Sequence, residues 1–230
     1  MSISILRLYN RVNDLAKKDQ SGYNTVAEFN DRINQVQLEV IEKVFSIIGL
    51  TQRASDFLFP FIKTTTITTS NTGLIIPPPD SLHYLSLSYI YADPVTGNVT
   101  NIPMRYLNAN EVDITATNPN RNANPVRGRV QYYDSNGSSF VTTNSSCTVL
   151  LRYIMNPPTA QISFTTQSNS QGYYQVFDPI NSIDLIWNDP AYNMIVYLML
   201  EKLGVEIREQ FLIEFSQALG IEREKITKND

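Results

Sequence analysis

Apolar residues near the N-terminus recur at spacings of three and four, which is the period of an amphipathic helix. This pattern predicts a first helix over residues 4–18, built on Ile5, Leu8, Val12 and Leu15. Lys17 and Lys18 lie at its C-terminal end, where the helix dipole favours positive charge. The first helix is therefore expected to have a single apolar face.

A second helix is predicted to begin after Thr25, because Thr25 and Glu28 have the spacing of a capping box. Its apolar residues form two faces. The first face comprises Val26, Phe29, Ile33, Val36 and Val40, and the second comprises Leu38, Ile41, Phe45 and Ile48. One β layer can cover only one of these faces, and a large exposed apolar patch marks a contact surface. We therefore expect Leu38, Ile41 and Phe45 to lie between neighbouring subunits.

The centre of the chain consists of short runs rich in Thr, Val, Ile and Tyr, which are typical of strands. The predicted strands cover residues 63–69, 74–76, 82–91, 99–106, 129–133, 147–155 and 173–177. Residues 93–97 have the composition of a turn and predict a hairpin between the third and fourth strands. Helical patterns return after this region, so the strands form a separate central block.

The C-terminal region is predicted to form two helices. Asp189 is placed as an N-cap and Pro190 as the first helical residue, with the helix continuing to Leu203. A last helix from about Val205 carries Phe211 and Phe215 on one face, which we expect to dock on the helical layer or on a neighbouring subunit. The predicted fold is α+β, with a helical layer from both termini and a central β-sandwich or barrel-like domain. The predicted divisions are 1–55, 56–182 and 183–230.

The charge of the chain changes this picture only slightly. Its 230 residues carry a net charge of −4, which argues against a whole-surface nucleic-acid binder. Arg121, Arg127 and Arg129 cluster around an Asn-rich loop, and either they contact DNA phosphates or an acidic partner, or the loop is simply solvated. The N-terminus lacks the pattern of a secretory signal, and the longest apolar run is too short to span a bilayer. We therefore expect no membrane partner.

Groups able to perform chemistry are sparse in the sequence. His83 is the single histidine and Cys147 the single cysteine, so a metal site or a nucleophile paired with a histidine is poorly supported. Carboxylate pairs among Asp178, Asp184 and Asp189 are possible, but Asp178 precedes a proline in a turn and Asp189 already has a capping role. We predict no catalytic residue, no metal and no cofactor, and hence a protein that is not an enzyme.

Four segments carry a resemblance to a known family. They are SGYNTVAEFNDRINQVQLEVIEKVF, GLIIPPPDSLHYLSLSYIY, VLLRYIMNPPTAQISF and DLIWNDPAYNMIVYLMLEKLGVEIREQFL. Together they resemble the head-to-tail connector proteins of tailed bacteriophages, in particular those of crAss-like phages. These segments span much of the chain, and the Asn-, Thr- and Tyr-rich centre is also typical of virion proteins.

The resemblance implies a structural subunit of a ring, often of twelve copies, which docks below the portal protein and closes the capsid vertex. Such a ring offers a surface to further neck or tail proteins and passes DNA through its bore without specific binding. It implies a location in the virion neck, after assembly in the host cytoplasm. An alternative function is a β-sandwich module that binds carbohydrate or a host surface, with some of the 13 tyrosines as a stacking platform.

Overall fold

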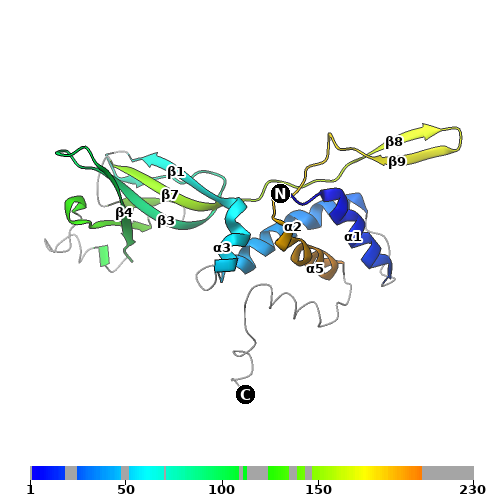
Figure 1. The fold of residues 1–230 in the computed structure, drawn as a ribbon, viewed down its shortest axis with the longest axis horizontal. Coiled ribbons are helices and arrows are strands. Elements are labelled where there is room, and N and C mark those ends of the chain that lie inside the picture. Colours follow the sequence, from blue (N-terminus) through cyan, green and yellow to red (C-terminus); the bar gives the residue numbers. More distant parts are fainter. Residues whose placement is uncertain are drawn as a thin grey trace, which may run out of the picture. The chain divides into compact units, whose positions relative to one another are not determined.

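The computed structural model of this protein describes residues 2–18, 25–47, 52–69, 71–108, 111–112, 124–134, 139–142 and 147–203. The fold is α+β, as the sequence predicts, with helices and a mixed, nearly closed barrel-like sheet (Figure 1). The chain divides into two compact units. One is helical and comprises Met1–Pro60 together with Pro157–Asp230, and the other comprises Phe61–Asn156 and contains the barrel.

The helical unit is built around α1 (Ile5–Lys18), α2 (Val26–Phe45) and α5 (Tyr192–Lys202), with α5 packed against both of the others (Figure 1). A shorter helix, α3 (Gln52–Leu58), leads into the turn Phe59–Phe61 and was not expected from the apolar pattern. The core consists of fully or almost fully buried apolar side chains, among them Ile5, Leu8, Val12, Phe29, Ile33, Val36, Val40, Trp187, Ile195 and Met199.

The ends of the helices are fixed by side chains. The capping box of α2 is confirmed, because the Thr25 hydroxyl accepts the Glu28 amide at 3.3 Å and the Glu28 carboxylate accepts the Thr25 amide at 3.0 Å. Asp184 accepts the amide of Ile5 at 2.9 Å and so caps α1 from a distant part of the chain. The start of α5 differs from the prediction. Asn188 precedes the tight turn Asp189–Ala191, and α5 itself begins at Tyr192.

The strand unit contains seven strands in the order β1-β7-β3-β4-β5-β6-β2. Their bounds are β1 Ile62–Thr68, β2 Leu74–Ile75, β3 Ser81–Ala92, β4 Val99–Tyr106, β5 Val130–Asp134, β6 Phe140–Thr142 and β7 Thr148–Met155. The expected hairpin is present, because β3 and β4 pair antiparallel. Among the strands that the structure describes, the pair formed by β4 and β5 is parallel and the others are antiparallel, so the sheet is mixed.

Chain connectivity explains why this sheet curls. Strands β1 and β2 are the two outer strands, yet residues 69–73 alone join them. Seven strands in a flat sheet would place the outer ones about 29 Å apart. The connecting segment can span at most about 20 Å. The two edges must therefore approach each other, and the buried side chains of Val149, Leu151 and Tyr153 fill the interior on one face of β7.

Residues 157–182 belong to the helical unit, although the sequence-based division placed them in the central β range 56–182. They include a separate two-stranded sheet formed by β8 (Phe164–Asn169) and β9 (Gly172–Phe177). This hairpin is therefore an addition to the helices and not part of the barrel.

Three side chains of α2 bind this returning segment through its backbone. The amide group of Asn34 donates to the Ala160 carbonyl at 3.0 Å and accepts the Ala160 amide at 2.9 Å. Asn30 makes the same pair with Ile162, at 3.0 and 2.8 Å. Gln37 donates to the Pro158 carbonyl at 3.4 Å and accepts the buried indole N–H of Trp187 at 3.2 Å. We call Asn30, Asn34 and Gln37 the amide ladder.

The ladder forms because the spacing of its residues along α2 matches the spacing of the peptide groups along the extended segment. Its residues lie one or two helical turns apart on α2, while alternate residues of an extended segment present their N–H and C=O groups to the same side. Gln161, which lies between Ala160 and Ile162, instead exchanges backbone hydrogen bonds with Ile183, at 3.2 and 2.7 Å. The segment is therefore held on one side by the side chains of α2 and on the other by a neighbouring strand-like stretch.

Removal of one rung should destabilise the helical unit. In Asn34→Ala, the N–H and C=O groups of the buried Ala160 lose both partners, so the free energy of unfolding should fall by about 3 kcal/mol. The matched control is Gln35→Ala at the exposed next position, which should change it by less than about 0.5 kcal/mol. Urea titration of both variants measures the difference, and equal small losses would show that the rung contributes nothing.

Candidate assembly surfaces

The hairpin of β8 and β9 is exposed along its length. The two strands pair antiparallel from Phe164 opposite Phe177 to Asn169 opposite Gly172, and residues 170–171 form the turn. All residues from 165 to 175 are exposed, on both faces of the hairpin. A two-stranded sheet that buries neither face is marginally stable at best in water. The hairpin is therefore an arm that has no apolar core of its own.

The composition of this arm leaves its edges open. No Asp, Glu, Lys, Arg or Pro occurs between Phe164 and Phe177. Natural proteins usually protect exposed strand edges with such residues. The arm instead displays Tyr173, which is 84% exposed, and Tyr174, whose hydroxyl donates to the Gln167 side chain at 3.1 Å. Its chemistry favours backbone pairing and aromatic contact with a partner.

Aromatic packing anchors the base of the arm to the helices. The ring of Phe164 lies 6.2 Å from that of Phe177 and 5.6 Å from that of Tyr9 on α1. Tyr9 in turn packs edge-on against the buried Phe29 of α2 at 5.0 Å. The base is therefore continuous with the core of the helical unit, while the tip is not covered by it.

A turn at Asp178 fixes the direction in which the chain leaves the arm. The buried Asp178 carboxylate accepts the Asn181 side-chain amide at 2.6 Å and the backbone amides of Asn181 and Ile180 at 3.2 and 3.0 Å. These donors, the Asn181 side chain foremost, hold the pKa of Asp178 below its ordinary value. Asp178 is therefore a charged turn residue.

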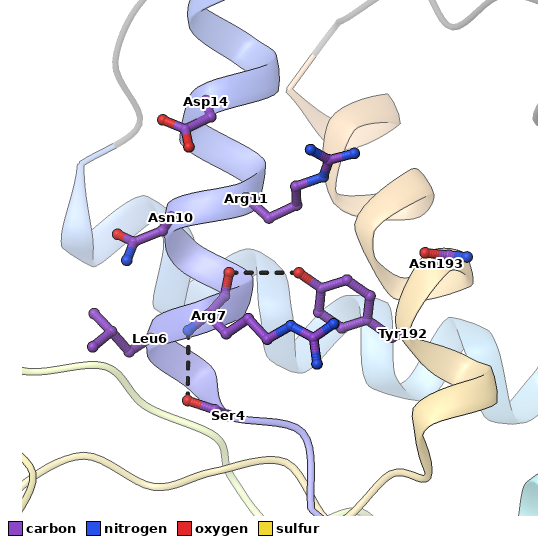
Figure 2. A pocket seen from close by; sticks show the side chains of 8 residues that line it. All are labelled: Ser4, Leu6, Arg7, Asn10, Arg11, Asp14, Tyr192 and Asn193. Atoms are coloured by element: carbon purple, nitrogen blue, oxygen red, sulfur yellow. Dashed lines mark hydrogen bonds between the residues drawn. The ribbon is translucent and has the colours of Figure 1, made fainter.

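A groove of about 760 Å³ lies between α1 and α5 (Figure 2). Its polar lining comes from Ser4, Arg7, Asn10, Arg11 and Asp14 on the side of α1 and from Tyr192 and Asn193 on α5. The Arg7 guanidinium stacks over the Tyr192 ring, 4.5 Å from its centre, and the Tyr192 hydroxyl donates to the Arg7 carbonyl at 3.5 Å. The Arg7 and Arg11 side chains reach toward α5, whereas Asn10 and Asp14 point away from it (Figure 2).

The outward face of α2 has the opposite charge. One stripe of exposed residues runs along this face at spacings of three and four, namely Glu28, Asp31, Gln35, Leu38 and Glu42, and the exposed Ala27 and Lys43 lie beside it. We call this stripe the acidic face. It contains three carboxylates and one apolar side chain, Leu38, which is 41% exposed. The helical unit thus carries a cationic groove on α1 and an anionic face on α2.

The structure changes the expectation for the second apolar face of α2. Ile41 is fully buried by the chain itself, so it is not available to a partner as expected. Both α5 and α3 pack on α2, and the apolar pattern of α2 alone did not reveal these contacts. Phe45 is half-buried, and Leu38 remains exposed. Phe211 and Phe215 lie outside the described residues.

The arginines of the Asn-rich loop are only partly described. Arg127 belongs to the short turn Pro125–Arg127, and Arg129 is exposed just before β5, where its backbone exchanges hydrogen bonds with Asn124. Arg121 lies outside the described residues. The choice between a DNA- or partner-binding loop and a solvated loop therefore stays open.

The residues singled out for chemistry hold structural positions. Cys147 is buried, and its sulfur lies 3.4 Å from the Thr69 hydroxyl, which also accepts the Cys147 amide. His83 lies half-buried in β3, opposite Ile154 of β7. Asp184 caps α1, and Asp189 is in the turn before α5. Among the described residues, no three His, Cys, Asp or Glu side chains are grouped as a metal site would require.

None of the helices in the described part of the chain is long and apolar enough to cross a membrane. Comparison with known proteins finds no protein family and no curated protein that matches this sequence.

The arm should be dispensable for folding. If Phe164 and Phe177 are joined directly by an Asn-Gly turn, the exposed residues 165–175 and the half-buried Val176 are lost while the aromatic base is kept. The free energy of unfolding should then change by less than about 1 kcal/mol, because almost all of the deleted side chains are in water. Denaturant titration tests this, and a loss of several kcal/mol would mean that the arm packs on the helices.

The Asp178 turn should make part of the stability depend on pH. A lowered folded-state pKa stabilises the protein above the ordinary value of 3.8, and this contribution is lost as the pH falls through the folded value. Asp178→Asn should therefore be less stable than the parent at neutral pH, and the difference should shrink below pH 3.8. Unfolding curves for both proteins across the acidic range measure it, and a difference independent of pH would contradict a role of the charge.

Proposed function

We propose that this protein is a structural virion subunit of a head-to-tail connector ring in a tailed bacteriophage. The observation that carries the structural role is the exposed arm formed by β8 and β9. The connector assignment rests in addition on the resemblance of four sequence segments to that family.

Exposed strand edges are a disadvantage to a protein that acts alone. The arm therefore supports a role in assembly. Uncharged, unprotected strand edges promote association with other chains. A fold that keeps such edges, and anchors their base through Phe164, Phe177 and Tyr9, gains from them only when a partner covers them. Strand addition would satisfy the free backbone groups, and Tyr173 and Tyr174 would supply buried area.

In this proposal the partners are further copies of the chain in a ring of about twelve subunits, the portal protein above it and neck or tail proteins below. DNA passes through the bore and is not held, which suits a chain of net charge −4. The protein is not an enzyme, and it acts without a metal or a cofactor. It is assembled in the host cytoplasm and functions in the neck of the virion.

The alternative, a module that binds carbohydrate or a host surface, needs tyrosines that are free to stack on a ligand. Several tyrosines of the barrel are instead used in packing. Tyr84 and Tyr132 both lie edge-on against the buried Phe140, at 4.6 and 5.6 Å. Tyr106 packs against Tyr132 at 5.5 Å, although about half of its surface is exposed. This use of the rings favours the connector proposal.

The proposal predicts where the protein is found and what the arm does there. Gold-labelled antibodies against the chain should mark the head–tail junction of virions, and purified rings should have about twelve times the 26.1 kDa mass of one chain. The variant that lacks residues 165–176 should fold but should not enter virions. Label on the capsid shell or the tail tip, or normal incorporation of the armless variant, would contradict the proposal.

A further inference from the structure

Two faces of the helical unit have complementary charge, and the chain does not pair them with each other. Within the described part of the chain, Arg7 and Arg11 make no ion pair, and both are exposed to solvent. Asp31, on the acidic face, likewise has no partner there. Among the described residues of the helical unit, Glu39 forms ion pairs with Lys43 and with Lys202.

The groove is prepared to receive a carboxylate. The Arg7 guanidinium lies over the Tyr192 ring, and its N–H groups can donate to a planar anion. Arg11 lies one turn further along α1 and reaches toward the same side. Asn193 of α5 adds an amide that can donate to a partner. The one carboxylate in the lining, Asp14, points away from α5 (Figure 2).

The acidic face has the form that such a groove can accept. Its exposed residues lie in one line along α2, so Asp31 and its neighbours can enter a groove between two helices lengthwise. Leu38 lies on the same line, and the contact would bury its exposed apolar side chain.

We infer that the groove between α1 and α5 of one copy binds the acidic face of α2 of a second copy. Such a contact joins two different faces of the same chain, so it is heterologous and propagates from copy to copy, closing when the rotation allows a ring. The inference deepens the proposed function, on whose homo-oligomer it rests, by naming the two surfaces that meet.

Duplex DNA is the other polyanion that could enter a groove with two arginines. The charge of the chain and the lining of the groove favour a protein partner over DNA. A chain of net charge −4 repels DNA at long range, and two cations release few counterions. The lining also holds a carboxylate, and its amide groups match peptide groups as well as they match phosphates. The experiment below therefore measures DNA binding beside self-association.

Charge reversal separates these possibilities in the full-length protein. The groove variant is Arg7→Glu with Arg11→Glu, and the face variant is Asp31→Arg with Gln35→Lys. Each should lower the association constant of the chain with itself at least about tenfold, because like charges then meet. The four substitutions combined in one chain should restore association, and so should a mixture of the two variants. Arg152→Glu, on an exposed strand position of the barrel, is the matched control and should have no effect.

Sedimentation velocity at low ionic strength measures association, and thermal unfolding checks that each variant folds. A parent chain that stays monomeric up to about 1 mM overturns the inference. It is also overturned if the combined variant fails to recover, or if the groove variant loses binding to a short DNA duplex while self-association is unchanged. If charge reversal acts as expected but virions lack the protein at their neck, the proposed function fails and this contact stands.

Discussion

The helical unit depends on the binding of one extended segment by the side chains of α2. When the chain leaves the barrel it must return to the helices, and an extended backbone there would bury N–H and C=O groups without partners. The amide ladder supplies those partners, because Asn30 and Asn34 each donate and accept at one residue of the segment. Unpaired buried peptide groups cost more than a typical hydrogen bond contributes, so the ladder decides whether the segment can be there at all.

Other features follow from that placement. Gln37 joins the ladder to the buried Trp187, and the ladder thereby connects the return segment to the stretch that leads into α5. That same stretch pairs Leu185 with Ile3 and caps α1 through Asp184. The arm begins two residues after Ile162, so its base is positioned by the last rung and by the contact of Phe164 with Tyr9. A rigid base with an uncovered tip is the arrangement that an assembly arm requires.

The sequence predicted the elements that depend on local patterns. The capping box of α2 and the hairpin of β3 and β4 follow from nearest-neighbour chemistry and apolar spacing. The ladder could not be predicted in this way. Asn30, Asn34 and Gln37 resemble the polar side of an amphipathic helix, and their partners lie more than a hundred residues away. The burial of Ile41 was missed because the packing of other helices on α2 is a tertiary contact that the apolar spacing of α2 does not reveal.

Of the candidate surfaces, only the arm left a signal in the sequence that could have been found. A strand pair with no charged residue and no proline lacks the usual protection of exposed edges. The groove of α1 and α5 and the acidic face of α2 could not be found without the packing, since each depends on which side of a helix is left uncovered. The complementary charge of the two surfaces is a property of the folded unit.

Hydrogen exchange at single residues tests the role of the ladder most directly. The backbone amides of Ala160 and Ile162 donate to the side chains of Asn34 and Asn30, and not to the backbone carbonyls of a strand or a helix. If the ladder holds the segment, these two amides exchange as slowly as the amides inside α2, and Asn30→Ala releases Ile162 first. If both exchange as fast as the exposed amides at the turn of the arm, the ladder does not fix the segment and the account of the helical unit is wrong.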